Sequence, residues 1–573
     1  MKILSLHCDY IKFKAVKKAI KEPEELFEEK KKEIIVKEPL VILTAVEKGD
    51  EANKNIVEQY LKEIKDIAKQ VNAKNIVLYP YAHLSPNLSK PAFAMETMKK
   101  AEAELSKDKN FKVTRAPFGY YKEFELKCKG HPLAELSREI NSEGKQSQKE
   151  KIISVSEEVY DYKKLLNEIS KTKLDREKLK DNDHRIIGKQ MDLFSFSETA
   201  PGMVFWHNNG LIIKNKLIEF WREEHKKAGY EEVSTPQILD KKLWQISGHW
   251  EKYRENIFLT QYENRVFAIK PMNCPGGILI FKLKQRSYKD FPIRVAELGI
   301  IHRQELSGVL GGLFRVIQFM QDDAHLYCRE EQLEDELIRV IELIEKFYKL
   351  FGFSYRVELS TRPEKRIGDD KIWDKAEQTL EKALKKKKMQ FKINKGDGAF
   401  YGPKIDFHIK DSLGREWQCG TLQLDFAMPE RFDLTYIDEN NKAQRPVMLH
   451  RTVYGSLERF IGIITEHYNG RFPLWLAPIQ VRIINFTDRN NKTCEKLKQE
   501  LEKEDIRVDA DLTSEPLQGK IKQAEIEKIP YIIVIGDKEE KAGTLAVRKD
   551  NKITQIKAKE FLDKIKKEIL EKL

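Results

Sequence analysis

Apolar positions recur with the period of strands in some parts of this chain of 573 residues and with the period of helices in others. Changes in this pattern divide the chain into parts. The first 140 residues alternate strand-like runs, such as PLVILTAVEK, with helix-like runs, such as NKNIVEQYLKEIKDIAKQV, which predicts a compact α/β or α+β domain. A charged stretch with little apolar surface follows, then a region rich in aromatic residues and glycine, and finally the strand and helix rhythm of a small βαβ-type domain. The predicted parts are a domain at 1–143, a charged, helix-containing linker at 144–185, the largest domain at 186–472 and a C-terminal domain at 473–573.

The stretch from Ile293 to His325 changes character within a few residues. It begins as an apolar run, IRVAELGII, becomes polar at HRQE, crosses a glycine-containing loop and returns through FRVIQF. This predicts two antiparallel strands joined by a long loop. Arginines on both strands suit a nucleotide, because guanidinium groups match phosphate oxygens and stay charged. An ordinary surface hairpin would have the same pattern, so the rest of the chain must decide between them.

Composition narrows the class of protein. No apolar run approaches the roughly 18 to 20 residues of a membrane span, and no charged-then-apolar leader precedes the first predicted strand. The six cysteines are scattered without paired spacing, which is typical of a reducing cytoplasm, so we expect a cytoplasmic protein with no membrane partner. A net charge of +12 favours a polyanionic partner such as nucleic acid, although lysine and glutamate enrichment is also typical of thermophile surfaces.

The largest domain contains three separated sequence features, and their order along the chain is informative. They are LIIKNKLIEFWREEHKKAGYEEVSTPQIL, which predicts a long helix, a turn at Gly229 and a strand; the hairpin above; and GSLERFIGIITEHY, a predicted helix with Arg459 in its first turn. This order resembles the three signature motifs of class II aminoacyl-tRNA synthetases. The resemblance implies an antiparallel ATP-binding sheet and a homodimer.

Longer strings give a narrower resemblance. KPMNCPGG, SGHWEKY, QDDAH, AFYGPKIDFHI, WQCGTLQLDF and VMLHRTVYGSLERFIG closely resemble the threonyl-tRNA synthetase family. The prolyl and seryl families share the broad motifs and lack the combination of Cys274, His325 and His450. Taken alone, these residues are more often an ordinary buried thiol and two hydrogen-bonded structural histidines than metal ligands. The resemblance implies that they bind one Zn2+ per subunit, and one Cys with two His leaves a tetrahedral ion one open position.

The resemblance assigns the substrates of the synthetic site. Six residues match positions that hold ATP and its Mg2+ in the family: Arg303 for the α-phosphate and also the threonine carboxylate, Arg315 for the β- or γ-phosphate, Glu305 for the adenine amino group, Phe319 and Arg459 for the faces of the adenine ring, and Gln418 for magnesium. Four more match positions near threonine: Gln321, Asp323, Tyr401 and Gln423, with Asp323 paired to the ammonium group. Arg303 and Arg459 would be the catalytic side chains.

Discrimination against serine predicts a second site. A zinc ion that binds the threonine hydroxyl can reject valine by about four to five powers of ten, but a missing methyl is worth only about 10 to 200-fold. The first 140 residues resemble the editing domain of archaeal-type threonyl-tRNA synthetases, which shares the fold of D-aminoacyl-tRNA deacylases. By that resemblance His83, Tyr121, Lys122 and Glu135 would line a pocket for the 3′ end of mischarged tRNA, with His83 and Lys122 catalytic.

The C-terminal region resembles the anticodon-binding module of the same group of synthetases. Glu539 and Arg548 match positions near the anticodon, although charged residues at strand ends are often only solvated. Three departures from the family pattern, at Gly277, Gly311 and Ile317, bear on contacts of the loops with the acceptor end of tRNA.

The predicted fold is therefore multidomain, α/β and α+β: an N-terminal domain like the D-aminoacyl-tRNA deacylases, an antiparallel-sheet class II catalytic domain and a C-terminal α/β anticodon-binding domain. The expected function is that of a threonine–tRNA ligase, which activates threonine with ATP, transfers it to tRNA(Thr) and hydrolyses Ser-tRNA(Thr). The alternative is a non-catalytic synthetase paralogue that binds tRNA or mRNA.

Overall fold

The structure, a computed structural model, describes residues 1–20, 22–26, 32–85, 87–131, 133–140, 166, 179–263, 265–550 and 552–572. The chain divides into two compact units, Met1–Lys151 and Ile152–Leu573. Most of the linker predicted at 144–185 lies outside the described residues, so its helices stand as a prediction.

The N-terminal unit is built on one mixed sheet with strand order β2-β1-β3-β4-β5, in which β6 and β7 also pair with β1. Its main elements are β1 (Lys2–Lys18), β2 (Ile34–Lys37), β3 (Pro39–Ala45), α2 (Ile56–Gln70), β4 (Asn75–Pro80), α3 (Pro91–Ser106), β5 (Lys112–Arg115), β6 (Tyr120–Cys128) and β7 (Glu135–Glu139). Strands β3, β4 and β5 run parallel to one another.

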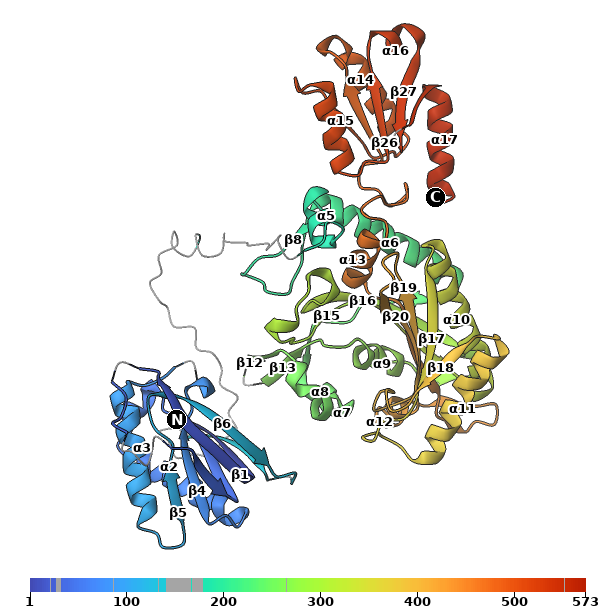
Figure 1. Ribbon diagram of the computed structural model, residues 1–573. Helices are drawn as coiled ribbons and strands as arrows, with labels where there is room; N and C mark the ends of the chain where they lie inside the picture. The colour runs from blue at the N-terminus through green and yellow to red at the C-terminus, as the bar shows by residue number, and fades with distance from the viewer. Residues whose placement is uncertain are drawn as a thin grey trace. The chain divides into compact units, whose positions relative to one another are not determined.

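The central strand of this sheet, β3, is buried along its whole length because both of its faces are covered. Leu40 and Ile42 pack with α2 and α3, the two helices beside the sheet in Figure 1. Val41 and Leu43 pack on the other face with residues from the later half of β1, such as Ile11 and Phe13. A continuous apolar run is what a strand buried on both faces requires.

The large unit contains an eight-stranded sheet with strand order β10-β15-β16-β23-β20-β19-β17-β18. Its strands are β10 (Glu231–Glu232), β15 (Ile293–His302), β16 (Gln318–Cys328), β17 (Ser354–Ser360), β18 (Phe391–Asn394), β19 (Lys404–Lys410), β20 (Glu416–Asp425) and β23 (Val447–Ser456). The longer helices around it are α5 (His184–Gln190), α6 (Asn208–Lys227), α9 (Cys274–Lys282), α10 (Leu333–Leu350), α11 (Asp370–Lys386) and α13 (Leu457–His467). Smaller elements fill the connections: β8 (Phe194–Ser195), β9 (Phe205–Trp206), β11 (Ile238–Asp240), α7 (Lys241–Ile246), α8 (His249–Tyr253), β12 (Leu259–Tyr262), β13 (Arg265–Ile269), β14 (Arg286–Ser287), α12 (Ala427–Arg431), β21 (Tyr436–Ile437) and β22 (Ala443–Gln444).

The three predicted features of this unit are confirmed as elements of secondary structure. Strands β15 and β16 pair antiparallel over their full length, from Ile293 opposite Tyr327 to His302 opposite Gln318. Helix α6 is followed by Gly229 in the left-handed region, at φ +77°, and by the short strand β10. Helix α13 begins after Ser456, whose side chain accepts a hydrogen bond from the backbone N–H of Arg459 and so caps the helix.

The two faces of the eight-stranded sheet differ in chemistry. On one face Ala324 and Leu326 of β16 and Leu422 and Leu424 of β20 join the largest apolar core, with residues of α6, α10 and α13. Because side chains alternate along a strand, the residues between them point to the opposite face. That face carries the polar side chains described below, and Figure 1 shows α9 on its side of the strands.

The C-terminal part is a five-stranded sheet of order β25-β24-β26-β27-β28 with helices along it. Its elements are β24 (Val481–Asn485), α14 (Asn491–Glu502), β25 (Val508–Asp511), α15 (Leu517–Ile526), β26 (Tyr531–Ile535), α16 (Asp537–Ala542), β27 (Thr544–Lys549), β28 (Lys552–Lys557) and α17 (Ala558–Leu570). The first three strands are parallel, as the predicted βαβ rhythm requires.

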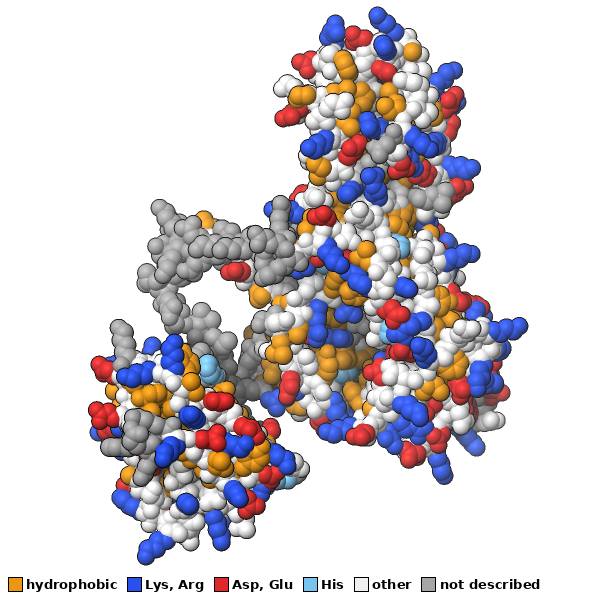
Figure 2. Space-filling model, viewed as in Figure 1, with side chains coloured by type: hydrophobic (Ala, Val, Ile, Leu, Met, Phe, Trp, Pro, Cys, Tyr) orange, Lys and Arg blue, Asp and Glu red, His pale blue; other side chains and the backbone are white. Residues whose placement is uncertain are grey.

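The surface mixes charges of both signs. Figure 2 shows Lys and Arg interspersed with Asp and Glu on the visible face rather than gathered in one patch. Across the described residues no helix is both long and apolar enough to cross a membrane. All six cysteines are free thiols, and five of them are buried.

Candidate functional site

Strand pairing in the large unit brings polar side chains into two rows on one face of the sheet. In the first row Glu297 lies opposite Asp323, Asp323 opposite Thr452, and Thr452 opposite Thr421. Two residues further along, His325 lies opposite His450, and His450 opposite Gln423. Directly opposed residues share a face, so residues more than 100 positions apart in sequence become neighbours.

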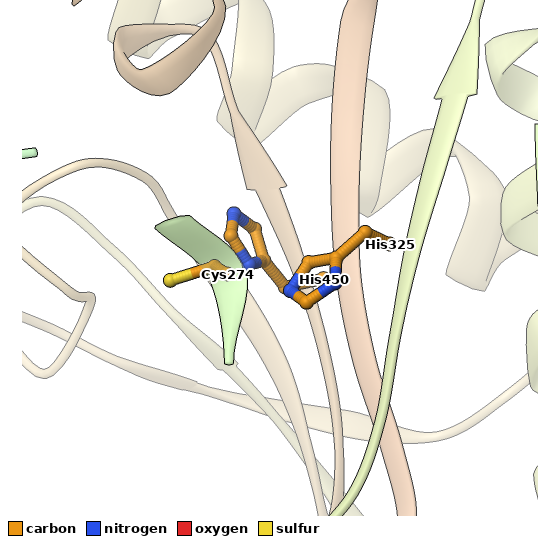
Figure 3. Close-up of side chains that lie close together, drawn as sticks. All are labelled: Cys274, His325 and His450. Atoms are coloured by element: carbon orange, nitrogen blue, oxygen red, sulfur yellow. The ribbon is translucent and has the colours of Figure 1, made fainter. Parts of the chain in front are cut away.

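Cys274, the first residue of α9, lies beside the second row. Its Sγ and one ring nitrogen each of His325 and His450 all lie within 4.8 Å of one another, and all three residues are buried. The two imidazole rings are 5.0 Å apart between centroids and nearly perpendicular. Figure 3 shows the three side chains gathered where α9 begins beside β16 and β23.

The hydrogen bonds of this cluster leave ligand atoms available. His450 donates from Nε2 to Oδ2 of Asp425 at 2.7 Å, which leaves Nδ1 with a lone pair. Nε2 of His325 is buried and has no hydrogen-bond partner among the described residues. Burial raises the pKa of the Cys274 thiol well above its ordinary value, so without a cation this group is neutral. A thiol, two imidazoles and a carboxylate bonded to one of them fit a zinc ion.

A cavity of about 180 Å³ opens beside the cluster. Cys274 and His450 form part of its wall, together with Met272 and eight residues that carry polar groups: Arg303, Gln321, Asp323, Tyr401, Thr421, Gln423, Arg451 and Thr452. The cavity has room for several water molecules, a size that suits a small amino acid. It unites Arg303 with all four residues that the sequence predicts near threonine.

Asp323 is the carboxylate in the wall of this cavity. Burial raises its pKa to about 6, so the group is still ionised at neutral pH and can pair with an ammonium group. Beneath it Lys270 and Glu297 form a fully buried ion pair at 2.8 Å, and Thr235 donates to Glu297 from both its N–H and its hydroxyl. This arrangement compensates the buried charge of Glu297 next to Asp323.

The predicted ATP residues lie at the edge of the cavity and beyond it. The Arg303 guanidinium lies 5.3 Å from the ring centre of Phe319 and donates to the carbonyl of Pro271 at 3.3 Å. Arg459 donates from Nε to the carbonyl of Phe314 at 2.9 Å. Arg315 and Glu305 form an ion pair at 2.8 Å. Except for Arg303, these residues do not line the amino-acid cavity.

The side chain of Gln418, predicted near magnesium, is fixed by a hydrogen bond to a buried carboxylate. It donates from Nε2 to Oδ1 of Asp406 at 2.6 Å, and Asp406 also accepts hydrogen bonds from Thr421 and Ser360. Lys404 pairs with the second oxygen of Asp406 at 2.8 Å. The buried carboxylate therefore fixes both Gln418 and one wall residue of the cavity.

The N-terminal unit contains a cavity of about 480 Å³. His83, Tyr121 and Lys122 line it together with Thr44, Tyr79, Tyr81, Ser89 and Tyr120. Lys122 donates from Nζ to the carbonyls of Pro117 and Tyr120, each at 3.1 Å, and its ammonium group lies 5.0 Å from the centre of the Tyr79 ring. One N–H of the ammonium group remains for a ligand.

The structure does not place Glu135 in this cavity, which corrects the sequence-based grouping of four residues. Glu135 is exposed, begins β7 and lies opposite Leu6 of β1. Its negative charge instead acts on the Cys8 and Cys128 thiols, whose pKa values are raised mainly by burial. Sequence likeness places a residue in a pattern, but strand register decides which surface it faces.

Several site residues were not predicted from the sequence. Asp425, Thr421 and Thr452 all fall within the quoted strings WQCGTLQLDF and VMLHRTVYGSLERFIG. The signal was present, because Thr421, Gln423 and Asp425 recur at every second position and must share one face of a strand. Only the pairing of β20 with β23 shows that this face carries His450.

The three departures from the family pattern lie in different surroundings. A Cβ at Gly277 would approach Nδ1 of His325 to 3.4 Å, whereas one at Gly311 would meet nothing within 4 Å. Ile317 is buried, and its N–H donates to the carbonyl of Gly202 at 2.7 Å. In the C-terminal part Glu539 accepts a bond from the N–H of Gly536, and Arg548 pairs with Glu525 at 3.5 Å.

Comparison with known proteins divides the chain into the same three folded parts as the sequence analysis. Three family models match: the archaea-specific editing domain of threonyl-tRNA synthetase over residues 1–140, the class II tRNA synthetase core domain (G, H, P, S and T) over residues 258–468, and an anticodon-binding domain over residues 480–568. The threonine–tRNA ligase of Clostridium botulinum strain Loch Maree is 55% identical over 395 residues, which is 69% of this chain and 62% of that protein. The chain thus matches less than two thirds of the length of its curated relatives.

Two solved structures are also similar. The RNA-binding domain of the threonyl-tRNA synthetase of Cryptosporidium parvum is 37% identical with a TM-score of 0.65, and the match covers 67% of this chain and 98% of that one. ThrRS-1 of Aeropyrum pernix is 29% identical with a TM-score of 0.60, over 68% of this chain and 96% of that one.

The largely antiparallel sheet, the hairpin with its arginines and the capped helix α13 define a class II aminoacyl-tRNA synthetase core. Together with the editing and anticodon-binding domains that flank it, the relatives narrow the assignment. The chain belongs to the threonyl-tRNA synthetase family.

The surroundings of Lys122 predict an unusual titration. Burial lowers its pKa to about 8, against 10.5 for a free lysine. Between these values the unfolded chain binds the proton and the folded chain has released it, so this group favours folding increasingly as pH rises from about 8. We expect NMR of 13C-dimethylated protein to show one lysine that titrates near pH 8 and is missing in Lys122→Met. If every lysine titrates above pH 10, the environment described for Lys122 is wrong.

Proposed function

We propose that the protein is a threonine–tRNA ligase that forms threonyl-adenylate from threonine and ATP, transfers the threonyl group to the 3′ end of tRNA(Thr), and hydrolyses Ser-tRNA(Thr) in its N-terminal unit. The observation that carries the proposal is the cluster of Cys274, His325 and His450 in the wall of a small polar cavity. A protein that only binds RNA has no need of this cluster or of Arg303 beside it. The proposal includes a homodimer, as the resemblance implies, and a cytoplasmic location, as the scattered cysteines led us to expect.

The amino-acid cavity supports recognition of threonine by its polar groups. Cys274, His325 and His450 would hold one zinc ion, which when bound supplies a Lewis-acidic partner for an amino and a hydroxyl group. Asp323 is ionised and buried, so it is suited to pair with the substrate ammonium group. Gln423 donates to the carbonyl of Gly402 at 3.3 Å, which fixes its side chain in the cavity wall.

Activation needs the threonine carboxylate and the α-phosphate of ATP to approach despite their like charges. Arg303 is the one guanidinium whose predicted role spans both groups, and its position on the cavity wall beside the ring of Phe319 supports that role. Catalysis of this kind depends mainly on positioning and on neutralising charge. Arg459 and Phe319 would hold the adenine ring, Glu305 its amino group, Arg315 the outer phosphates and Gln418 the magnesium ion.

The N-terminal cavity suits the 3′ end of an aminoacylated tRNA. Its aromatic residues can stack on adenine, and the spare N–H of Lys122 can donate to the ribose or to the ester oxygen. A water molecule would attack the ester carbonyl, and the ribose hydroxyl would leave as the serine is released. His83 lies 5.5 Å from Tyr81 between ring centres at the cavity wall, where it can orient that water.

Amino-acid-dependent exchange of pyrophosphate into ATP tests the synthetic reaction. We expect strong exchange with threonine, roughly 10 to 200-fold less with serine, and at least about four powers of ten less with valine, because valine lacks the hydroxyl. Proline should support none. Folded, zinc-supplied protein that gives no exchange with any of these amino acids would favour the alternative of an RNA-binding paralogue.

Metal analysis tests the ligand set independently of activity. We expect about one zinc per chain in the wild type, and loss of that zinc after dialysis in Cys274→Ala, because two imidazoles alone bind zinc weakly. Cys328→Ala is the matched control. Like Cys274, Cys328 is a buried thiol, but it lies at the end of β16 and outside the cluster. Equal zinc content in the two variants would show that the metal binds elsewhere.

Deacylation of Ser-tRNA(Thr) by the full chain tests the second reaction. We expect Lys122→Met to lose at least about tenfold in rate while exchange with threonine is unchanged, because the donor to the ribose or ester is gone. Lys127→Met on the same strand is the control, since Lys127 is exposed and pairs with Asp9. Editing by Lys122 is ruled out if both variants hydrolyse Ser-tRNA at the wild-type rate.

A further inference from the structure

His184, the first residue of α5, is buried in the large unit and belongs to none of the sites described above. It is 1% exposed, and Glu466 of α13 beside it is 3% exposed. Nδ1 of His184 lies 2.6 Å from Oε1 of Glu466, and the backbone N–H of His184 donates to the same oxygen at 2.9 Å. The backbone N–H of Leu313 donates to Nε2 of His184 at 2.9 Å.

These bonds fix the protonation of the ring. Nε2 accepts from Leu313 and so carries no proton, and Nδ1 must then carry the proton that it donates to Glu466. Asp183, His184 and Glu466 also lie close enough together to suggest a metal site. Both ring nitrogens are already engaged, however, so the cluster is a hydrogen-bond junction rather than a set of free ligands.

The junction holds the returning side of the loop between β15 and β16. Gly312 has φ +56°, and a Cβ there would lie 2.2 Å from Nε2 of His184, so only glycine allows this approach. The rings of His184 and Phe314 are 4.3 Å apart, and Trp417 lies 4.3 Å from Phe314. A Cβ at Gly462 of α13 would come within 3.1 Å of both Leu313 and Phe314, so the helix also packs tightly on the loop.

The junction continues to a residue of the proposed ATP site. The carbonyl of Phe314 accepts the bond from Nε of Arg459. Glu466 pairs through its other oxygen with Arg415 at 2.6 Å, and the Arg415 guanidinium lies 5.5 Å from the centre of the Phe314 ring. Phe314 is therefore held on several sides, and its carbonyl in turn sets the direction of the Arg459 guanidinium.

We propose that His184 is a positioning residue for ATP: through Leu313 and Phe314 it fixes the loop between β15 and β16 and the orientation of Arg459 toward the nucleotide. This inference rests on the proposed function for the role of Arg459. Within the part of the chain that the structure describes, none of the bonds of His184 reaches a residue that lines the amino-acid cavity. The effect of His184 should therefore fall on ATP and spare threonine.

Two substitutions separate the two ring nitrogens. An asparagine amide reaches about as far as Nδ1 and loses the acceptor for Leu313, whereas a glutamine oxygen reaches about as far as Nε2 and keeps it. In the full-length protein we expect His184→Asn to raise the KM for ATP in pyrophosphate exchange about tenfold with an unchanged KM for threonine. His184→Gln should recover most of that loss. His207→Asn, at the residue that precedes α6 and lies outside this junction, should behave as wild type.

Two measurements keep this inference separate from the proposed function. Titration calorimetry with Mg-ATP should give the same weakening without any need for turnover. Hydrogen exchange should be faster over residues 311–316 in His184→Asn than in wild type or His184→Gln. The inference is overturned by a wild-type ATP affinity and wild-type protection in His184→Asn, or by equal losses for ATP and threonine without rescue by glutamine. A wild type that binds ATP but gives no exchange would overturn the proposed function alone.

Discussion

The pairing of β16 between β15 and β23 is the constraint on which the large unit depends. Its register sets His325 against His450 and Asp323 against Glu297 and Thr452. A slip of one residue would turn His325 and Asp323 into the apolar core and expose Ala324 and Leu326 on the polar face. The apolar face therefore fixes the register, and the register assembles the site.

Burial shifts the protonation of the groups on the polar face, and it also costs folding free energy wherever a buried polar group lacks a partner. A neutral Cys274 thiol, an unpartnered His325 nitrogen and an Asp323 carboxyl with a pKa of about 6 lie within one small region. Buried polar groups usually have partners, so a buried ring nitrogen of His325 without one among the described residues is what a binding site for a cation requires. The ion pair of Lys270 with Glu297, and Asp406 with its four partners, instead hold the surrounding structure in place.

Much of the fold was predictable because its signals are local. The strand pair between Ile293 and His325, the apolar run of β3 and the helix that carries Arg459 in its first turn are each visible in a short window of sequence. The cluster of Cys274, His325 and His450 came from family strings, since spacings of 51 and 125 residues carry no local signal. Glu135 and His184 show what local signals could not predict. The register of β7 against β1 keeps Glu135 out of the N-terminal cavity, and packing between residues far apart in sequence brings His184 against Leu313.

Crystals of the full-length protein grown with threonine, measured at wavelengths on both sides of the zinc absorption edge, would test the central claim most directly. The account predicts one anomalous peak bounded by Cys274, His325 and His450, with the threonine hydroxyl and amino groups facing it and the ammonium near Asp323. An active protein with threonine in the cavity and no metal between these three residues would contradict it.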